Sequence, residues 1–236
     1  MDELPGGARR IAFFGGSFDP PHLGHLAVAQ AACAALALDA VLFAPVGAQP
    51  LKPQGSTAAF DDRAEMTRLA IAGEPAFSVS LADGPTGSGK PNYTIDTLHR
   101  LRGRLPSGGT LFCLMGADSL LGLRNWHRGA EVPFAAQLVV ASRPGESLDD
   151  LSAALPSGLR IEETLEMPPC TVPPAIEIRC YRIRKDAGES VPLFLLPGLY
   201  VEISATEIRE KIRTGSAGDL LPAAVAAYIR SHNLYR

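Results

Sequence analysis

The sequence lacks the features that mark a membrane protein, a secreted protein or a chain rich in disulfides. Its apolar runs stop well short of the roughly 18–20 residues that a spanning helix requires. Residues 1–7 have neither the basic start nor the long apolar stretch of a signal peptide. The four cysteines lie far apart and form no C-x-x-C pair, which argues against a cysteine-ligated zinc site (Cys33, Cys113, Cys170 and Cys180). These absences favour a cytoplasmic location, away from membranes.

A strong excess of one charge is also absent. Lys and Arg number 22 and Asp and Glu 25, so the net charge is −3. No global basic field therefore exists to hold nucleic acid, and any bound anion must be held by local groups. The chain has 236 residues, of which 46% are hydrophobic, and this suffices for a sizeable core in one large or two small domains.

Short apolar runs alternate with helical periodicity along most of the chain. Strands are expected at 11–14, 41–44, 77–81, 111–115 and 138–141, and helices at 22–37, 61–72 and 93–102. Asp61 is the expected N-cap of the second helix. Continuous apolar strands that alternate with helices predict a parallel sheet covered on both faces. We therefore expect an α/β fold with a doubly wound, Rossmann-like parallel sheet.

Residues 156–192 break this pattern. The segment is rich in proline, yet Ile176, Ile178, Tyr181 and Ile183 nearly alternate, as the apolar positions of a strand do. We expect an irregular insertion with one strand here. A C-terminal helical part should follow over 204–236, with helices at 205–214 and 221–232.

The most informative stretch follows the first expected strand and runs into the first helix: G-G-S-F-D-P-P-H-L-G-H, residues 15–25. Gly15 and Gly16 let the backbone approach a ligand closely. Unpaired N–H groups at the helix start then face the crevice at the end of the strand. His22 and His25 are three residues apart, so both project from one face of the first turn. The stretch predicts a phosphate-binding site.

Plainer interpretations of this stretch are available. The glycines and prolines could simply punctuate a helix start, and a lone histidine is more often a surface or core residue. Two histidines beside a glycine turn, with Gly24 between them leaving room for a flat nucleotide, favour a functional role. A zinc site on H-x-x-H would need a third ligand, and the sequence suggests none nearby.

The stretch resembles the G-G-[ST]-F-D-P-x-H-x-G-H signature of nucleotidylyltransferases with an H-x-G-H motif. Within that group the chain is most similar to the bacterial nicotinate-nucleotide adenylyltransferases, over nearly its whole length. The resemblance implies one nucleotidylyltransferase domain, 1–236, that joins ATP and nicotinate mononucleotide into deamido-NAD and pyrophosphate in NAD biosynthesis. It also implies that His22 and His25 act in catalysis. The residues of the stretch that it implies in ATP binding are Gly15, Gly16, Ser17, Phe18 and Gly24.

A second motif, I-S-A-T-E-I-R, occupies residues 203–209. Ser204 and Glu207 form a capping box, which alone would explain a helix start. The cap does not explain Thr206 or Arg209, and a helix N-terminus with two hydroxyls and a fixed cation suits a polyphosphate. The motif is similar to the family's I-S-[AS]-T-x-[IV]-R. This implies that Ser204 and Thr206 bind ATP and that Arg209 acts in catalysis by holding the departing phosphates.

Two further segments resemble motifs of the family. N-Y-T-I-D-T-L, residues 92–98, is similar to S-Y-T-x-x-T-L with Asn92 in place of serine, and implies that the backbone of Thr94 meets the pyridine carboxylate. G-A-D-S-L, residues 116–120, is similar to G-x-D-S-L and implies that Asp118 accepts hydrogen bonds from ribose hydroxyls. From the residues alone, Asp118 could equally be a helix N-cap.

Trp126 is the only tryptophan, and a single tryptophan is most often a core residue. Its position after G-A-D-S-L, followed by His127, resembles the W-[YH] of the family. The resemblance implies that the indole stacks on the pyridine ring and that the backbone amide of His127 helps to hold the acid group. Electron-poor rings stack well on indole faces.

The resemblance also implies two contacts to the mononucleotide phosphate, Arg143 and Lys52. S-R-P-G contains the second arginine of the family's R-R-P, with Ser142 where another arginine often stands. P-V-G-A-Q-P-L-K, residues 45–52, is similar to P-N-x-x-P-P-H-[KR], but Val46 and Leu51 replace the asparagine and the histidine. These departures concern the mononucleotide phosphate and not the ATP half.

A competing nucleotide motif is G-P-T-G-S-G-K, residues 84–90, which fits the P-loop pattern G-x-x-x-x-G-K. Pro91 stands where that pattern needs a hydroxyl for Mg²⁺, and proline has no N–H to offer a phosphate. We interpret the segment as a loop.

The resulting hypothesis is adenylyl transfer with Mg²⁺ carried by ATP, without a metal site built by the protein. The attacking phosphate is already anionic, so positioning and charge stabilisation should suffice for catalysis. Two alternatives stay open: nicotinamide mononucleotide or phosphopantetheine as the acceptor, and a non-catalytic nucleotide-binding regulator. No nucleic acid or membrane partner is expected, and a homo-oligomer is compatible with the sequence.

Overall fold

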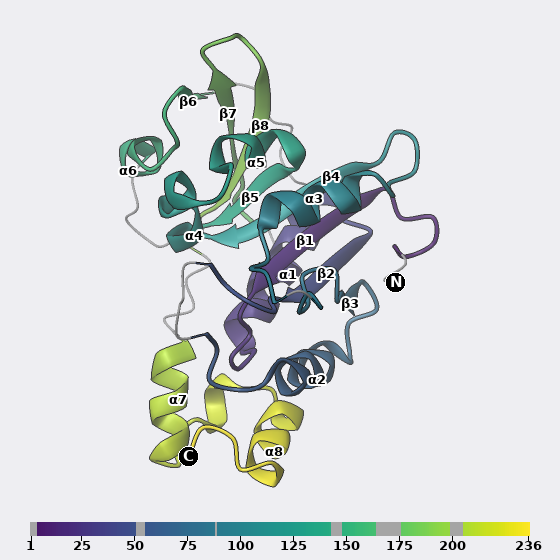
Figure 1. Cartoon of the computed structure of the whole chain (residues 1–236), viewed down its shortest axis with the longest axis vertical. Helices are drawn as coiled ribbons and strands as arrows, with labels where there is room; N and C mark the ends of the chain where they lie inside the picture. The colour runs from purple at the N-terminus through teal and green to yellow at the C-terminus, as the bar shows by residue number, and fades with distance from the viewer. Residues whose placement is uncertain (1–3, 51–54, 88, 143–147, 164–175, 199–204) are drawn as a thin grey trace.

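The computed structural model describes the chain except residues 1–3, 51–54, 88, 143–147, 164–175 and 199–204. Its strands form an eight-stranded sheet in the order β3-β2-β1-β4-β5-β8-β7-β6 (Figure 1). The strands are β1 (Arg10–Gly16), β2 (Ala40–Pro45), β3 (Phe77–Val79), β4 (Thr110–Gly116), β5 (Gln137–Ala141), β6 (Leu159–Glu163), β7 (Arg179–Lys185) and β8 (Ser190–Leu196).

The first five strands and β8 run parallel to one another. β1 pairs with β2 on one side and with β4 on the other, and Gly15 and Gly16 lie beside Ala44 and Pro45 at the carboxyl end. β2 continues to β3, and β4 continues through β5 to β8, again in parallel. The expected α/β, doubly wound, Rossmann-like sheet is confirmed, with each of the five expected strands in place.

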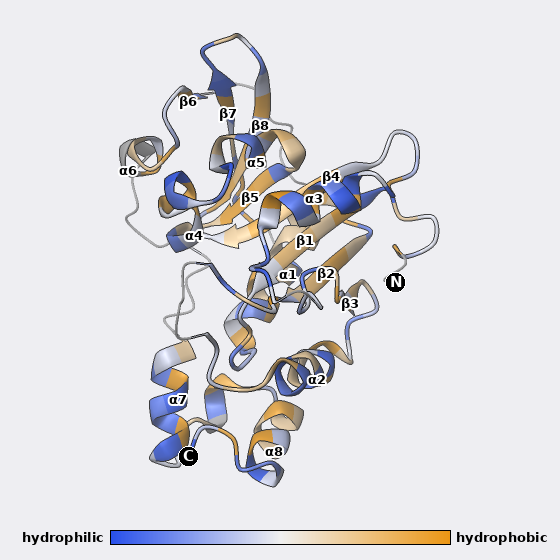
Figure 2. Cartoon of the chain, in the orientation of Figure 1, coloured by the Kyte–Doolittle hydropathy of each residue, from blue (hydrophilic) through white to orange (hydrophobic). Residues whose placement is uncertain are grey.

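Both faces of the sheet are buried, as the continuous apolar strands require. In β1, Ile11 and Phe13 belong to a core on one face, and Ala12 and Phe14 to a core on the other. Helix α3 (Thr94–Arg102) packs into the first core and α1 (Leu23–Leu36) into the second, so helices lie on opposite sides of the sheet. Figure 2 shows the apolar character of the central strands between these helices.

Shorter helices cover the remainder of the sheet on the α3 side. They lie in the chain between β4 and β6, and the first of them begins directly after the carboxyl end of β4. They are α4 (Ala117–Leu121), η1 (Leu123–Asn125), η2 (Gly129–Glu131), α5 (Val132–Ala135) and α6 (Leu148–Ala153). Buried Leu120, Val132 and Leu151 join them to the α3-side core. In the part of the chain that the structure describes, no helix combines the length and apolar character needed to cross a bilayer.

Helix α2 (Phe60–Ile71) begins one residue earlier than expected. The N–H of Arg63 donates to the carbonyl of Ala59, so Ala59 occupies the N-cap position and the interpretation of Asp61 as the N-cap is wrong. Asp61 lies instead in the first turn, where its carboxylate interacts favourably with the helix dipole.

The proline-rich insertion contains more sheet than the one expected strand. β6, β7 and the start of β8 all lie within 156–192, with β7 antiparallel to both neighbours. Ile176 and Ile178, which suggested the strand, precede β7 and are half-buried against the α1-side core. Tyr181 and Ile183 pack instead into the α3-side core, so the apolar alternation changes face between Ile178 and Tyr181.

The C-terminal helices form a third apolar cluster with α2. These are α7 (Ala205–Arg213), η3 (Gly218–Leu220) and α8 (Ala223–Ser231), and they match the helical part expected after residue 204. Buried Met66 of α2 shares the cluster with Ile208, Val225, Ile229 and Tyr235. Figure 1 shows α7 and α8 beside α2, at the end of the molecule away from β6 and β7.

Candidate functional site

The loop between β1 and α1 carries the first motif. A side chain at Gly15 would collide with the Phe13 ring, which lies 2.7 Å from the position of its Cβ. Phe18 adopts a left-handed conformation with φ of 47°, and its ring is fully buried against Phe14 and Phe43. At Gly15, Gly16 and Phe18 the backbone is therefore the part placed to meet a ligand, and the Phe18 ring anchors the loop from behind.

His22 and His25 lie together at the start of α1. Their ring centroids are 3.7 Å apart, and His25 also packs on the Phe18 ring at 4.9 Å. The His22 N–H donates to Nδ1 of His25 at 3.2 Å, so a neutral His25 ring carries its proton on Nε2. Nδ1 of His22 is buried and has no hydrogen-bond partner among the described residues.

Burial fixes the charge state of this pair. Loss of water contact lowers the pKa of His22 to about 4, and burial together with the neighbouring His22 lowers the pKa of His25 well below its usual value. Both rings are therefore neutral near pH 7 in the free protein. A neutral imidazole still offers one N–H, so each ring can donate a hydrogen bond to an anion.

A buried carboxylate, Asp19, links this loop to distant parts of the chain. Its side chain is 3% exposed. Oδ1 accepts hydrogen bonds from the N–H of Ala58 at 3.0 Å and from the Tyr235 hydroxyl at 2.7 Å, and Oδ2 accepts one from the N–H of Thr57 at 2.6 Å. Arg209 donates to the Asp19 main-chain carbonyl at 2.7 Å, with the same nitrogen 3.8 Å from Oδ2.

Arg63 of α2 is a second buried hub, with 2% of its surface exposed. Its guanidinium donates to the carbonyls of Ser17 at 2.7 Å, Val46 at 2.8 Å and Ala58 at 3.2 Å. Burial lowers its pKa, while the charge of Asp19 opposes that shift. Arg63 therefore holds the backbone at the ends of β1 and β2. Val46, which replaces the family's asparagine, takes part in this contact through its main-chain carbonyl, and its side chain is not involved.

The second motif reaches this loop through Arg209. Besides its bond to Asp19, the guanidinium donates to the hydroxyl of Thr206 at 3.2 Å, within the first turns of α7. The structure thus brings Arg209 and Thr206 to the β1–α1 loop, although 190 residues separate Arg209 from Asp19. Ser204 lies outside the described residues, as do Lys52 and Arg143.

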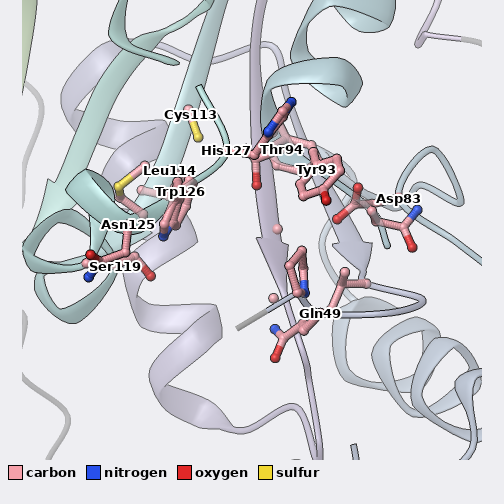
Figure 3. A pocket seen from close by; sticks show the side chains of 18 of the residues that line it. Gln49, Asp83, Tyr93, Thr94, Cys113, Leu114, Ser119, Asn125, Trp126 and His127 are labelled. Carbon is pink, nitrogen blue, oxygen red and sulfur yellow. The ribbon is translucent and has the colours of Figure 1, made fainter. Parts of the chain in front are cut away.

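A cavity of about 600 Å³ opens at the carboxyl ends of β1 and β4 (Figure 3). Six residues expected in the site line it: Gly15, Gly16, Thr94, Asp118, Trp126 and His127. Other lining residues were not expected, among them Gln49, Asp83, Tyr93, Cys113 and Asn125. The cavity therefore begins at the glycines of the first motif and extends toward the start of α3 and the segment 116–127.

Aromatic side chains form two walls of the cavity. Figure 3 shows Trp126 on one side and Tyr93 on the other, with His127 against Tyr93 at a centroid distance of 4.2 Å. Trp126 is half-buried and also packs against the α3-side core, so it serves the core and the cavity together. The chain turns after Trp126, where the N–H of Gly129 donates to the Trp126 carbonyl. Glycine is required at 129, because a Cβ there would lie 2.1 Å from the Leu123 carbonyl oxygen.

The start of α3 is held by Asn92, the residue that departs from the family's serine. Its Oδ1 accepts from the N–H of Ala48 at 3.0 Å, and its Nδ2 donates to the carbonyl of Gly84 at 2.8 Å. Asn92 thereby joins the loop after β2 to the loop before α3. Thr94 is the first residue of α3, where main-chain N–H groups have no acceptor within the helix.

Two carboxylates border the cavity in different settings. Asp83 is buried and accepts from the Thr97 hydroxyl at 2.8 Å, and burial raises its pKa. Asp118 is the second residue of α4, and Gly116 occupies the N-cap position, so the N-cap interpretation of Asp118 is wrong. Asp118 instead lies in the first turn with its side chain lining the cavity.

The P-loop-like segment bonds to itself. The N–H of Gly89 donates to the carbonyl of Thr86, and the Thr86 hydroxyl donates to the carbonyl of Lys90. Gly47 packs against this loop, with its Cβ position 2.5 Å from the nitrogen of Pro85. The segment is a loop beside the cavity, as expected, and its turn is closed by these internal bonds.

Sequence reasoning missed Asp19, Arg63 and Tyr235. Asp19 is the aspartate of the first motif, and no role was assigned to it from the sequence. Arg63 gave a weak signal, since it lies on the same helix face as buried Met66 and Thr67. The thiols of Cys33 and Cys113 are free, and burial raises the pKa of the Cys113 thiol to about 12. Among the described residues no group of three or more His, Cys, Asp or Glu side chains is placed to hold a metal ion.

Comparison with known families gives a match over most of the chain. Residues 13–211 match the model of the cytidylyltransferase-like family. The chain is 35% identical over 226 residues to a probable nicotinate-nucleotide adenylyltransferase of Solibacter usitatus, covering 96% of this chain and 99% of the relative. A protein of the same description from Pelobacter propionicus is 36% identical over 227 residues, with 96% and 98% covered.

Solved structures give the same fold at lower sequence identity. The nicotinic acid mononucleotide adenylyltransferase of Plasmodium falciparum complexed with NaAD superposes with a TM-score of 0.66 at 15% identity, over 96% of this chain and 97% of that one. The complex of that protein with APC gives a TM-score of 0.64 at 14% identity, with the same shares covered. At this identity the likeness bears on the fold alone.

Proposed function

The chain belongs to the cytidylyltransferase-like family and, within it, to the nicotinate-nucleotide adenylyltransferases, and from this membership we infer that it joins ATP and nicotinate mononucleotide. The products are deamido-NAD and pyrophosphate, in a step of NAD biosynthesis. The observation that carries this function is the continuity of the site. Gly15 and Gly16 belong both to the expected phosphate loop and to the cavity that Trp126 and Tyr93 enclose.

The reaction that this arrangement supports is an in-line displacement. A phosphate oxygen of nicotinate mononucleotide attacks the α-phosphorus of ATP, a new P–O bond forms, and the bond to the β-phosphate oxygen breaks. The electron pair of that bond leaves on pyrophosphate. The nucleophile is an anion already, so no side chain has to remove a proton from it.

On the phosphate side, we assign the backbone of Gly16, Ser17 and Phe18 to the nucleotide. His22 and His25 donate N–H groups to phosphate oxygens as charge develops, which fits their neutral state and the contact between their rings. Arg209, with Thr206 and Ser204, holds the β- and γ-phosphates that depart. Gly24 leaves space beside the histidines for the nucleotide.

On the pyridine side, the Trp126 indole stacks on the pyridine ring. The N–H groups of Thr94 and His127 bind the carboxylate, and the position of Thr94 at the first residue of α3 supports this assignment. Asp118 accepts hydrogen bonds from ribose hydroxyls. Lys52 and Arg143 are assigned to the mononucleotide phosphate on the family resemblance alone.

Mg²⁺ is assigned to the Mg-ATP substrate, bound by the triphosphate oxygens. When bound there, the ion neutralises the charge that builds up on the departing pyrophosphate. We further propose that residues 1–236 act as one nucleotidylyltransferase domain in the cytoplasm. The contacts of Asp19 with Arg209 and Tyr235, which join the first motif to the C-terminal helices, support a single working unit.

The test is pyrophosphate release from Mg-ATP with nicotinate mononucleotide, nicotinamide mononucleotide and phosphopantetheine offered in separate reactions. We expect the highest kcat/KM with nicotinate mononucleotide. A preference for either of the other acceptors would overturn the substrate assignment. ATP binding without pyrophosphate release from any of the three would indicate a non-catalytic nucleotide-binding regulator instead.

A further inference from the structure

Tyr235 occupies a position that ordinary packing of a helix end does not require. α8 ends at Ser231, and the chain then turns back through Asn233 and Tyr235, both in the left-handed region with φ of 54° and 65°. Asparagine adopts that conformation comparatively readily, but for the bulky side chain of Tyr235 it is unfavourable. The turn places the Tyr235 side chain inside the molecule, where only 5% of the residue is exposed.

The hydroxyl of Tyr235 meets one specific atom, Oδ1 of Asp19, at 2.7 Å. The pKa of this hydroxyl is raised by burial and by the adjacent Asp19, so the group stays protonated and acts as the donor. The other carboxylate oxygen of Asp19 faces Thr57 and Arg209. Tyr235 and Arg209 therefore hold the same aspartate from two sides.

Arg209 is bound to Asp19 through the main-chain carbonyl as well, at 2.7 Å. The position of that carbonyl depends on how the aspartate is held, because side chain and carbonyl belong to one residue. Asp19 is also two residues from Ser17 and three from His22, so its placement bears on the whole loop. A change at Tyr235 is thus transmitted to the guanidinium through one intervening residue.

We propose that Tyr235 is a positioning residue for the triphosphate: through Asp19 it holds the Arg209 guanidinium where the β- and γ-phosphates of ATP bind. This inference rests on the proposed function of Arg209. It adds that the segment after α8 sets the affinity for ATP, although it lies outside both recognised motifs. Tyr235 acts through Asp19 and is given no contact with substrate.

The chain offers a matched control in Tyr228. This tyrosine lies in α8, belongs to the same apolar cluster, and donates its hydroxyl to Oδ1 of Asp62 at 2.9 Å. Asp62 belongs to α2 and has no role in the loop after β1. Tyr228→Phe therefore removes the same chemical group from the same helical cluster without touching Asp19.

The first experiment compares Tyr235→Phe with Tyr228→Phe in steady-state kinetics, at a temperature well below the melting temperature of each variant. We expect Tyr235→Phe to raise the KM for ATP about five- to tenfold, because only part of the free energy of one hydrogen bond to a charged group is transmitted through Asp19 to ATP binding. The KM for nicotinate mononucleotide should change less than about twofold, and Tyr228→Phe should leave both constants within about twofold. A lower melting temperature for Tyr235→Phe with an unchanged KM for ATP would overturn the proposal and leave Tyr235 as a packing residue.

A double-mutant cycle tests whether the effect passes through Arg209. In an Arg209→Ala background, Tyr235→Phe should change the KM for ATP by less than about twofold, because the group that it positions is gone. A full five- to tenfold effect in that background would contradict transmission through Arg209. Calorimetric titration with a non-hydrolysable ATP analogue gives the same cycle in dissociation constants, without any reaction. A failure of this inference appears in those constants, whereas a failure of the proposed reaction appears in the pyrophosphate assay of the wild-type protein.

Hydrogen exchange on the wild-type protein provides a test that does not depend on any variant folding. If Tyr235 strengthens ATP binding, linkage requires ATP to strengthen the Tyr235 contact in return. Addition of the analogue should then slow amide exchange at residues 232–236 and at Thr57 and Ala58. Unchanged exchange at residues 232–236, with slowing confined to 15–25, would overturn the inference.

Discussion

Around the β1–α1 loop, the groups that meet at Asp19 and Arg63 come from four distant segments of the chain. The cavity wall is different, because residues 92–94 and 113–127 supply most of it. The phosphate side is held by hydrogen bonds to two buried charges. The side proposed for the pyridine is shaped by rings: half-buried Trp126 against the core, and half-buried Tyr93 beside exposed His127.

This difference separates two ways of building a binding surface. Phosphate oxygens need hydrogen-bond donors at fixed positions, and a network of buried hydrogen bonds can hold donors in this way. Because the network is buried, the loss of one member costs much of the free energy of unfolding. A flat ring needs apolar faces at a suitable spacing, and such contacts tolerate adjustment. Damage to the phosphate side should therefore spread through the fold, whereas damage to the pyridine side should stay local.

Loss of Arg63 should give the largest effect. Arg63→Leu leaves three carbonyls without their donor and removes a positive neighbour of Asp19, so the free energy of unfolding should fall by about 3 kcal/mol or more. Urea denaturation measures this. The matched control is Arg68→Leu on the same helix, whose exposed side chain pairs with Glu65 and whose loss should cost about 0.5 kcal/mol or less. Equal losses for the two variants would contradict the view of Arg63 as a hub.

His25→Ala should act on catalysis at the phosphate side. We expect kcat to fall on the order of 10²-fold or more, equivalent to about 2.7 kcal/mol of transition-state stabilisation, because one phosphate donor is removed. Single-turnover pyrophosphate release would measure the chemical step, and a urea denaturation curve would show whether the fold persists. A kcat near that of the wild type would exclude His25 from the reaction.

Trp126→Ala should confine its effect to the pyridine side. The KM for nicotinate mononucleotide should rise about tenfold through loss of the stacking surface, with the KM for ATP nearly unchanged. Trp126→Phe keeps an aromatic face and should show a smaller rise. If both variants raised the two KM values equally, the tryptophan would be a core residue whose loss disturbs the whole site.

The smallest effect concerns pH and the buried histidine pair. The pKa of His22 is about 4 in the folded protein against 6.5 for an unperturbed histidine, so the unfolded chain binds the proton first as pH falls. Stability is therefore lost as pH drops below about 6.5, by about 1 kcal/mol from this residue between pH 7.5 and 6. Urea denaturation at the two pH values should show a smaller loss for His22→Gln than for the wild type. The same loss in both proteins would mean that His22 is not held neutral by the fold.

Features that lie within one short stretch of sequence could be predicted. The buried strands, the glycines at the end of β1 and the paired histidines each depend on neighbours a few residues away, and the structure places the glycines and histidines at the expected end of the sheet. Trp126 could be placed at the site because it follows a recognisable segment. Its shared role in core and cavity needed the structure.

Features that depend on distant partners could not be predicted. Tyr235 meets Asp19 across 216 residues, and no periodicity or spacing encodes that pairing. One strand was expected in this region, and Tyr181 and Ile183 of β7 belong to the pattern that predicted it. β8 was missed for another reason, because Pro192 lies inside it and a proline within an apolar run argues against a strand. The assignments of Lys52, Arg143 and Ser204 stay predictions.

The strand order has a consequence for how copies of this chain can meet. One border of the sheet is β3, only three residues long, and the other is β6, whose Arg160 pairs with Glu162 and with Asp186 of the β7–β8 turn at 3.1 Å each. Short borders and charged borders both discourage a neighbouring molecule from adding a strand. Within the part of the chain that the structure describes, the two borders of the sheet are therefore poor templates for edge-to-edge aggregation, and helical or loop surfaces are the better candidates for self-association.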